Sequence, residues 1–418
     1  AARAGCSVCL VANGVGNSPE IHALNCPVRD DDSVELYVKD TLCAGKGTND
    51  LALVETLCRE SVALREEFAF DRNPDGSYHA IQPLGSTVPR CVSIGHAIGA
   101  VALRRIQDEL KGKVEVVEGR VTSLEWRMGT GDLLVSGASR TAIPVSGAPR
   151  AADVAGGPLV SGAPRAADKG NDMVMSWVSP PRGAAETGAA EMFVARLAPQ
   201  LDQGLSIVAR AVVLATGGWC GKYDFSTNPP YLRGDGIELA QALGAAVRDL
   251  DIVQYEPTVR VGGPRRGVPV ITTLLYRGAT LRNAKGEDFL PDLHLNKDEM
   301  SKAILAEMAR TNAPGVWYDL TAVAEADLRD CRMDPSERRI FVAPAPHTSL
   351  GGVVIDPVCR VLDAQGVPIP GLFAAGEVTG GLHGLNRLGG NAGTETLVFG
   401  KIAGESAAEY AKTDYERN

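Results

Sequence analysis

Short apolar runs that end at glycine or turn residues alternate along the chain with segments of helical periodicity. The apolar runs, which predict strands, lie at 7–11, 114–126, 206–216 and 372–375. The segments whose apolar positions recur every three to four residues, which predict helices, lie near 32–41, 50–68, 95–110, 297–310 and 394–408. This alternation is typical of an α/β fold, in which helices cover a mostly parallel sheet.

The first residues have the pattern of a helix end followed by a strand. Residues 1–4 precede Gly5, a typical helix terminator, and the strand at 7–11 follows. This is the second half of a β-α-β unit, whose opening strand and glycine-rich phosphate loop would precede residue 1. Such a unit spans about 30 residues, so either roughly 15–25 of them are missing, which we favour, or the unit was never present.

Residues 127–190 interrupt the alternation with a stretch rich in Ala, Gly, Pro and Ser. The sequence Val-Ser-Gly-Ala-Pro-Arg-Ala-Ala-Asp occurs at 145–153 and again at 160–168, and a weaker copy starts at Val135. Copies this short and this few do not build a solenoid. We therefore predict a flexible, mostly disordered surface insertion, with a binding role as the alternative.

A change of character from about 247 to 344 indicates a second domain. Short strands surround one helix there, whereas 345–418 returns to the strand, glycine loop and helix pattern of the first block. We predict that 1–246 and 345–418 form one domain, into which 247–344 is inserted as an α+β domain.

Composition narrows the class of protein. The chain is 44% hydrophobic and 22% charged, and its net charge of −9 argues against non-specific nucleic-acid binding. No apolar run approaches the roughly 20 residues of a membrane span. Nine cysteines at irregular spacing favour a reducing, cytoplasmic setting. Cys6 and Cys9 would face opposite sides of a strand, so we predict neither a redox pair nor a metal site.

The densest group of chemically versatile residues follows the strand at 372–375. Gly376 and Glu377 come first, and the glycine-rich loop after them carries four polar side chains: His383, Asn386, Arg387 and Asn391. Glycines let a backbone approach a ligand closely, and a helix N-terminus offers N–H groups to an anionic or electron-rich partner. The pattern favours a loop that binds both cofactor and substrate over a simple connection, with His383 shaping the loop.

Six motifs in a fixed order carry a resemblance to a known family. They are Ala215-Thr-Gly-Gly218, Thr227-Asn-Pro-Pro230, Gly234-Asp-Gly236, His347-Thr-Ser-Leu-Gly-Gly352, Ala375-Gly-Glu377 and His383-Gly-Leu-Asn-Arg-Leu-Gly-Gly-Asn391. The chain resembles the flavoprotein family of fumarate reductase, succinate dehydrogenase and L-aspartate oxidase over nearly everything outside 127–190. The resemblance implies a doubly wound, Rossmann-like domain that binds FAD, and a capping domain that closes over a dicarboxylate beside the flavin.

The resemblance also implies which residues contact FAD. They are Thr216, Gly217, Gly218, Asp235, Gly376, Glu377, Asn391 and Ala392. A carboxylate such as Glu377 suits ribose or ribityl hydroxyls, whereas Asp235 could equally be a helix N-cap, or serve both roles. Because 17–25 lacks the family's histidine-bearing attachment segment, we expect FAD to be bound non-covalently.

On the substrate side, the resemblance implies a carboxylate site. Its residues are Glu256, Thr272, Lys297, His347, Thr348 and Arg387, of which Lys297, His347 and Arg387 would be catalytic. Arg387 can grip a carboxylate with two hydrogen bonds, and His347 can donate to the same or the other carboxylate. Lys297 would supply a proton, with a solvated lysine at a helix start as the alternative.

Two positions depart from the family pattern. Glu256 stands where the family usually has a substrate-binding histidine, and Lys297 stands where it has a proton-transferring arginine. Glu256 would repel a dicarboxylate unless it were protonated or paired, and it could instead accept a hydrogen bond from an amine or amide. Because of these two substitutions, the resemblance to the family does not identify the substrate.

Three functions follow in order of preference. The first is an FAD-dependent oxidoreductase of the fumarate reductase type, acting on the C=C or C–C bond of a small carboxylate. The second is an amino-acid oxidase similar to L-aspartate oxidase, and the third is a non-catalytic flavoprotein or electron-transfer subunit. The chain has no cysteine spacing for an iron–sulfur cluster of its own, so such a cluster would belong to a partner protein.

Overall fold

The computed structural model describes residues 1–12, 16–83, 85–95, 97–118, 120–127, 175–179, 192–197, 206–290, 295–331 and 333–416. Its largest sheet has six strands in the order β16 (Arg360–Leu362), β17 (Pro368–Ala374), β9 (Ala211–Leu214), β6 (Met175–Ser179), β1 (Ser7–Ala12) and β4 (Glu115–Glu118). β17 is parallel to β9 and β1 is parallel to β4. The predicted α/β class is confirmed, in a sheet that β6 makes mixed by running antiparallel to both neighbours.

β6 lies inside the segment that the sequence predicted to be a flexible insertion, and for 175–179 that prediction was wrong. The strand pairs with β1 on one side and β9 on the other, in the middle of the sheet. It satisfies backbone N–H and C=O groups on the facing edges of both strands, which would otherwise be buried without partners. The repeats at 145–153 and 160–168 lie outside the described residues.

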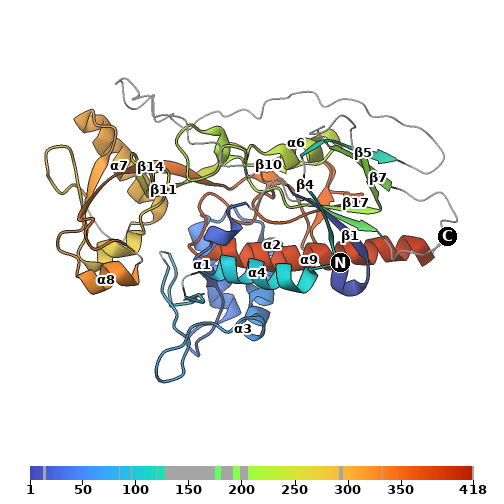
Figure 1. The fold of residues 1–418 in the computed structure, drawn as a ribbon, viewed down its shortest axis with the longest axis horizontal. Helices are drawn as coiled ribbons and strands as arrows, with labels where there is room; N and C mark the ends of the chain where they lie inside the picture. Colours follow the sequence, from blue (N-terminus) through green and yellow to red (C-terminus); the bar gives the residue numbers. More distant parts are fainter. Residues whose placement is uncertain are drawn as a thin grey trace.

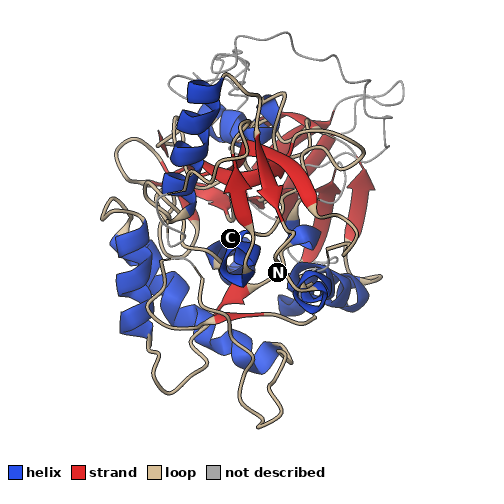
Figure 2. Cartoon of the chain, turned by 90° about the vertical axis from the view of Figure 1, so that its left-hand side faces the viewer, coloured by secondary structure: helices blue, strands red, loops and turns tan. Residues whose placement is uncertain are grey.

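Helices cover one face of this sheet. α9 (Asn391–Glu416) packs against β17, β9 and β6, and α1 (Val34–Ala44), α2 (Leu51–Glu60), α3 (Leu64–Glu67) and α4 (Ile98–Leu110) lie on the same side (Figure 1). On the other side lie α6 (Asp235–Ala242) and a sheet of β5 (Val121–Arg127), β7 (Met192–Leu197) and β8 (Ser206–Ala209). Figure 2, turned by 90°, shows helices on either side of the strands.

Local capping explains where the first helices begin. The Ser33 hydroxyl accepts the N–H of Leu36 at the start of α1, and the Asp50 carboxylate accepts two N–H groups at the start of α2. The predicted helix at 50–68 is divided into α2, a short 3-10 turn η3 (Ser61–Ala63) and α3. At the chain start, η1 (Ala2–Ala4) ends at Gly5 with a φ of 79°, as its glycine predicted.

A second apolar core lies away from the six-stranded sheet. Four antiparallel strands form it in the order β11 (Val253–Arg260), β14 (Arg339–Ser349), β13 (Val316–Asp319) and β12 (Thr280–Arg282). α7 (Lys297–Thr311) packs on β11 and β14, and η5 (Thr272–Arg277) and α8 (Glu325–Asp330) complete this lobe at the left of Figure 1. Its buried residues include Met300, Ile304, Tyr318 and Val342.

The two lobes are joined by continuous strands. β14 crosses the boundary predicted at 344 and runs on to Ser349, and β11 lies beside it over most of its length. Two further sheets have only two strands each. One pairs β2 (Leu24–Asn25) with β3 (Cys91–Val92), and the other pairs β10 (Val247–Arg248) with β15 (Gly352–Val353). The domain boundaries themselves stay a prediction.

Within the described ranges, every helix is too short or insufficiently apolar to cross a lipid bilayer. All nine cysteines are free thiols, and Cys6 and Cys9 do not pair. The described residues also contain no cluster of three or more His, Cys, Asp or Glu side chains placed to hold a metal ion.

Candidate functional site

Two loops meet at one edge of the six-stranded sheet. β9 and β17 are parallel neighbours, with Val213 opposite Phe373, so the segments that follow them, 215–218 and 375–377, leave the sheet at the same edge. The Ala375 N–H donates to the Leu214 carbonyl at 3.0 Å and continues the pairing into the loops. Ligands of open α/β sheets bind at this carboxyl edge.

Glycines allow the loops at this edge to pack closely. A Cβ atom added at Gly218 would clash with the Glu377 carboxylate and the Ser349 hydroxyl, and one added at Gly236 would clash with the Thr216 side chain. Thr216 Oγ1 is buried and has no hydrogen-bond partner among the described residues. A buried hydroxyl in this state requires a partner, and a dinucleotide at this edge would supply one.

Glu377 is held beside this edge by Ser349. Its Oε1 accepts both the Ser349 N–H and the Ser349 hydroxyl at 2.9 Å. Enclosure by protein nevertheless raises the pKa of Glu377 from 4.5 to about 7, because burial penalises the charged form more than these hydrogen bonds favour it. Hydroxyl donors from a ribose or ribityl chain would stabilise its carboxylate form.

Changing Glu377 to glutamine should alter how the stability of the FAD-free protein depends on pH. Between pH 4.5 and about 7 the folded protein holds a proton that the unfolded chain has lost, so its free energy of unfolding falls as pH rises through this window. Glu377→Gln does not titrate and its oxygen still accepts from Ser349. Between about pH 5 and pH 8, the free energy of unfolding of the wild type should therefore fall by roughly 2–3 kcal/mol more than that of the variant.

Urea unfolding at the two pH values measures this difference. Glu409→Gln, at an exposed position of α9, is the matched control and should follow the wild-type dependence. If the free energy of unfolding changed by the same amount between the two pH values in wild type and in Glu377→Gln, the Glu377 carboxyl would not take up a proton on folding.

Asp235 and Asn391 occupy positions that sequence reasoning described only in part. Gly234, with a φ of 81°, is the N-cap of α6, so the alternative that Asp235 is the cap was wrong; a glycine adopts this left-handed conformation without strain. Asp235 is the first residue of α6 and forms an ion pair with Arg120 at 2.7 Å. Asn391 is fully buried at the start of α9, next to Ala392.

The Asn391 side chain is engaged by the protein. Its Oδ1 accepts from the Tyr37 hydroxyl at 2.8 Å and from the Asn25 amide at 2.7 Å. A contact with FAD at this point would therefore come from the backbone at the start of α9, where the first-turn N–H groups and Ala392 lie. The FAD contacts of Asp235, Asn391 and Ala392 stay predictions.

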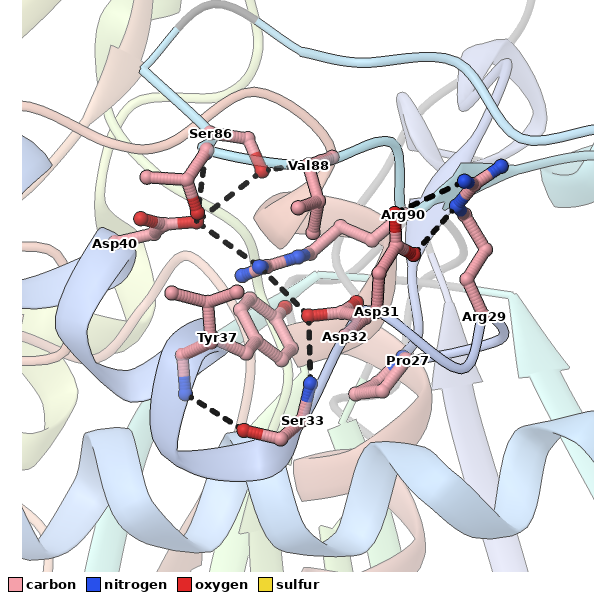
Figure 3. Close-up of polar contacts among 12 residues, drawn as sticks. Pro27, Arg29, Asp31, Asp32, Ser33, Tyr37, Asp40, Ser86, Val88 and Arg90 are labelled. Atoms are coloured by element: carbon pink, nitrogen blue, oxygen red, sulfur yellow. Dashed lines mark hydrogen bonds and ion pairs between the residues drawn. The ribbon is translucent and has the colours of Figure 1, made fainter.

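A buried ion-pair network supports this helix start (Figure 3). Arg90 is fully buried and contacts the carboxylates of Asp32 at 2.8 Å and Asp40 at 2.9 Å. Its guanidinium lies 4.8 Å from the centroid of the Tyr37 ring, and Tyr37 in turn binds Asn391. The network thus connects α1 and the loop before β3 to the first residue of α9.

A second set of polar residues meets where the two lobes join. Glu256 on β11 and Lys297 at the start of α7 form an ion pair, in which Glu256 is almost fully buried and Lys297 is 26% exposed. Asn296 caps α7 with a capping box to Glu299, and this orients the first helical residue. Lys297 thus pairs with a buried carboxylate while part of its side chain stays exposed, and its catalytic role stays a prediction.

His347 lies on β14 near this pair. Its Nδ1 is 2.8 Å from the Thr227 hydroxyl, and the Asn228 amide donates to the His347 carbonyl at 2.7 Å. Enclosure by protein, together with the charges of Lys297 and Arg387, lowers the pKa of His347 to about 4. The imidazole is therefore neutral near pH 7.

Glu256 is ionised despite its burial. Desolvation alone would raise its pKa, but the charges of Lys297 and Arg387 and the hydrogen bond from Lys297 together hold the pKa of Glu256 below its ordinary value. Lys297 and Glu256 thus form a compensated pair of opposite charges inside the site.

Arg387 contributes a charge that has no direct ion-pair partner among the described residues. Its side chain is only 8% exposed, and among the described residues its Nε has no hydrogen-bond partner and no carboxylate lies within ion-pair distance. The Gln254 amide holds the loop in place by donating to the Arg387 carbonyl at 3.1 Å and to Asn386 at 2.7 Å. A buried guanidinium in this state is suited to bind an anion.

The structure brings Glu256, Lys297, His347 and Arg387 within electrostatic reach of one another. Thr348 is buried beside His347 on β14, and Thr272 is buried at the start of η5; their substrate contacts stay predictions. His383 is hydrogen-bonded to Glu395 of α9 at 2.8 Å and so connects the loop to the helix.

Sequence reasoning missed three residues that position this cluster. They are Gln254, Thr227 and Asn228. All three lie in or beside motifs noted in the sequence, and that position was the available signal. Their partners, 119 to 133 positions away, were not visible there.

Comparisons with known proteins agree with this geometry. A family model described as an FAD binding domain matches residues 1–392. The fumarate reductase (cytochrome) of Shewanella frigidimarina is 33% identical over 49% of this chain and 47% of its own length. The L-aspartate oxidase of Caulobacter vibrioides is 37% identical over 50% of this chain and 43% of its own length. The chain thus spans about half the length of the curated relatives it matches.

Among solved structures, the open conformation of a flavocytochrome c3 fumarate reductase superposes with a TM-score of 0.64. The superposition covers 95% of this chain and 72% of the fumarate reductase chain, and the two sequences are 23% identical, so this likeness shows the fold. The match along the chain confirms the predicted resemblance and FAD as the cofactor. Non-covalent attachment stays a prediction.

Proposed function

Because this chain belongs to the FAD-binding-domain family of flavoproteins, we propose that it is an FAD-dependent oxidoreductase of the fumarate reductase type. Its substrate is a small carboxylate with a C=C or C–C bond, and the bound FAD supplies hydride transfer at N5. The observation that carries the proposal is Arg387, a buried guanidinium without an anionic partner in the described part of the chain.

Each residue of the cluster has a distinct role in this proposal. Arg387 binds the substrate carboxylate with two parallel hydrogen bonds and so fixes the position of the neighbouring carbons. Thr227 holds one ring nitrogen of His347, which leaves Nε2 to hydrogen-bond the substrate. Because the imidazole is neutral, it adds a directed hydrogen bond without adding a charge.

Lys297 is the proton donor in the reductive direction. Its ammonium is held toward the site by Glu256, and it would give a proton to one of the two substrate carbons that are reduced. Glu256 keeps Lys297 oriented between turnovers. In the desaturation direction the same amine accepts the proton.

Turnover assays on the FAD-loaded protein test this function. With reduced viologen as electron donor, fumarate and a series of monocarboxylic 2-enoates should be tried, and at least one should oxidise the viologen. If FAD binds but no enoate and no amino acid changes its redox state, the protein is a non-catalytic flavoprotein and both enzyme functions fail.

A second candidate is an amino-acid oxidase. The L-aspartate oxidase of Caulobacter vibrioides is among the relatives, and Glu256 places a carboxylate where an amino group would be recognised. Reduction of the flavin by L-aspartate, without viologen oxidation by any enoate, would favour this function.

The cellular setting belongs to the same proposal. We place the protein in the cytoplasm, because none of its nine cysteines forms a disulfide. An iron–sulfur partner protein would deliver the electrons, since the described residues contain no cysteine cluster for this purpose.

A further inference from the structure

The charges around Arg387 set how many carboxylates the site accepts. Lys297 and Glu256 neutralise each other as an ion pair, and His347 is neutral because burial keeps its pKa near 4. Arg387 therefore provides the single uncompensated positive charge of this cluster. Two other acids, Glu377 and Glu395, also act on Arg387, and their negative charges can only weaken its attraction for an anion.

The ion pair between Glu256 and Lys297 is built into the fold. Glu256 lies opposite the small residue Ala345 on the neighbouring strand, and the capping box at Asn296 sets the direction of Lys297. The next residue, Asp298, pairs with Lys302 and Lys46 on the exposed side of α7. Only Lys297 among these cations is directed to Glu256, so the pair is a local and specific arrangement.

A second carboxylate on the substrate would be repelled by the Glu256 carboxylate of this ion pair. The first carboxylate neutralises Arg387, so a second one would add an unbalanced negative charge beside the buried Glu256 carboxylate. To gain Lys297 as its partner, it would have to displace Glu256, which would leave that acid buried and unpaired. Like charges brought together in a buried site oppose binding strongly.

We infer that the substrate is a monocarboxylate, a 2-enoate whose end remote from the carboxylate is uncharged, and that Glu256 determines this specificity. The inference rests on the proposed function, because it names the substrate class of the same site. Arg387 binds the carboxylate, and the compensated Glu256–Lys297 pair faces a neutral remote group.

Binding of saturated acids to the protein with its FAD already reduced, so that no oxidant is present for their desaturation, tests the specificity independently of turnover. Isothermal titration calorimetry and the flavin absorbance of the FAD-loaded protein report binding of butyrate and of succinate, its dicarboxylate counterpart. Butyrate should bind, and succinate should bind on the order of a hundredfold more weakly. Succinate binding equal to or tighter than butyrate binding in the wild-type protein would overturn the inference.

A substitution at Glu256 tests the cause. Glu256→Gln removes the negative charge at nearly unchanged shape and releases Lys297 to pair with a second carboxylate. Succinate affinity should rise by at least roughly tenfold, while butyrate affinity should change by less than about threefold. Glu60→Gln, on the exposed end of α2, is the control and should leave both affinities unchanged. An unchanged ratio of affinities in a folded Glu256→Gln protein would contradict the role of Glu256.

The two proposals fail in different ways. If butyrate is preferred but no enoate is reduced, the proposed function fails and the site's monocarboxylate specificity stands. If fumarate is reduced rapidly and succinate binds tightly, the proposed function stands and the monocarboxylate inference fails. Should Glu256→Gln not fold, the comparison of butyrate and succinate on the wild-type protein still decides the matter.

Discussion

Replacing Arg387 with lysine should lower kcat/KM by roughly a hundredfold, a loss of about 3 kcal/mol of transition-state stabilisation. A lysine keeps the positive charge but cannot form the paired, planar hydrogen bonds of a guanidinium. Among the described residues the Arg387 Nε has no partner, and Gln254 tethers the loop, so the geometry is set before substrate arrives. The measurement is steady-state turnover of the best enoate with reduced viologen.

The control for this variant is Arg59→Lys, at an exposed position on α2, which should leave turnover unchanged. The FAD content of both variants should equal that of the wild type, since Arg387 is assigned to substrate and not to cofactor. Wild-type turnover by a folded, FAD-loaded Arg387→Lys protein would mean that Arg387 does not bind the substrate carboxylate.

Replacing Arg90 with alanine should reduce the free energy of unfolding by about 3–5 kcal/mol. The change leaves the carboxylates of Asp32 and Asp40 buried without their cation, and burial already raises the pKa of Asp32 while Arg90 is present. It also removes the guanidinium from the Tyr37 ring. Urea unfolding near pH 7 measures the loss.

Arg29 supplies a matched control from the same region (Figure 3). It pairs with Asp31 at 2.8 Å, but both side chains are about half exposed, so Arg29→Ala should leave the free energy of unfolding close to that of the wild type. A triple variant, Arg90→Met with Asp32→Asn and Asp40→Asn, removes all three charges and should recover part of the stability. A loss below 1 kcal/mol for Arg90→Ala would show that the acids find other partners.

Local signals in the sequence were sufficient for the helices and for the cofactor. The starts predicted at 32 and 50 lie within two residues of the starts of α1 and α2, because a cap such as Ser33 or Asp50 acts on N–H groups two or three residues away. The segments 215–218 and 375–377 indicated a dinucleotide site because glycine loops after strands are themselves short, local patterns. Neither required knowledge of distant residues.

The sequence also showed which positions were unusual but not why. Glu256 and Lys297 each looked like a separate departure from the family, and they are 41 positions apart. In the folded chain they compensate each other, and this turns two anomalies into one ion pair. An ion pair depends on how β11 and α7 pack, and no local periodicity encodes that distance.

The same limit applies to the sheet and to the start of α9. Residues 175–179 lie in a low-complexity stretch, and only the facing edges of β1 and β9 make them a strand. Asn391 was visible as a loop residue, but its bond to Tyr37 joins positions 354 apart. By itself, the sequence determined the α/β class, the starts of α1, α2 and α7 to within about two residues, and the glycine loops after β9 and β17, which depend on neighbouring residues. The tertiary structure alone decided which buried charges are paired, because burial and partners are set by segments that meet only on folding.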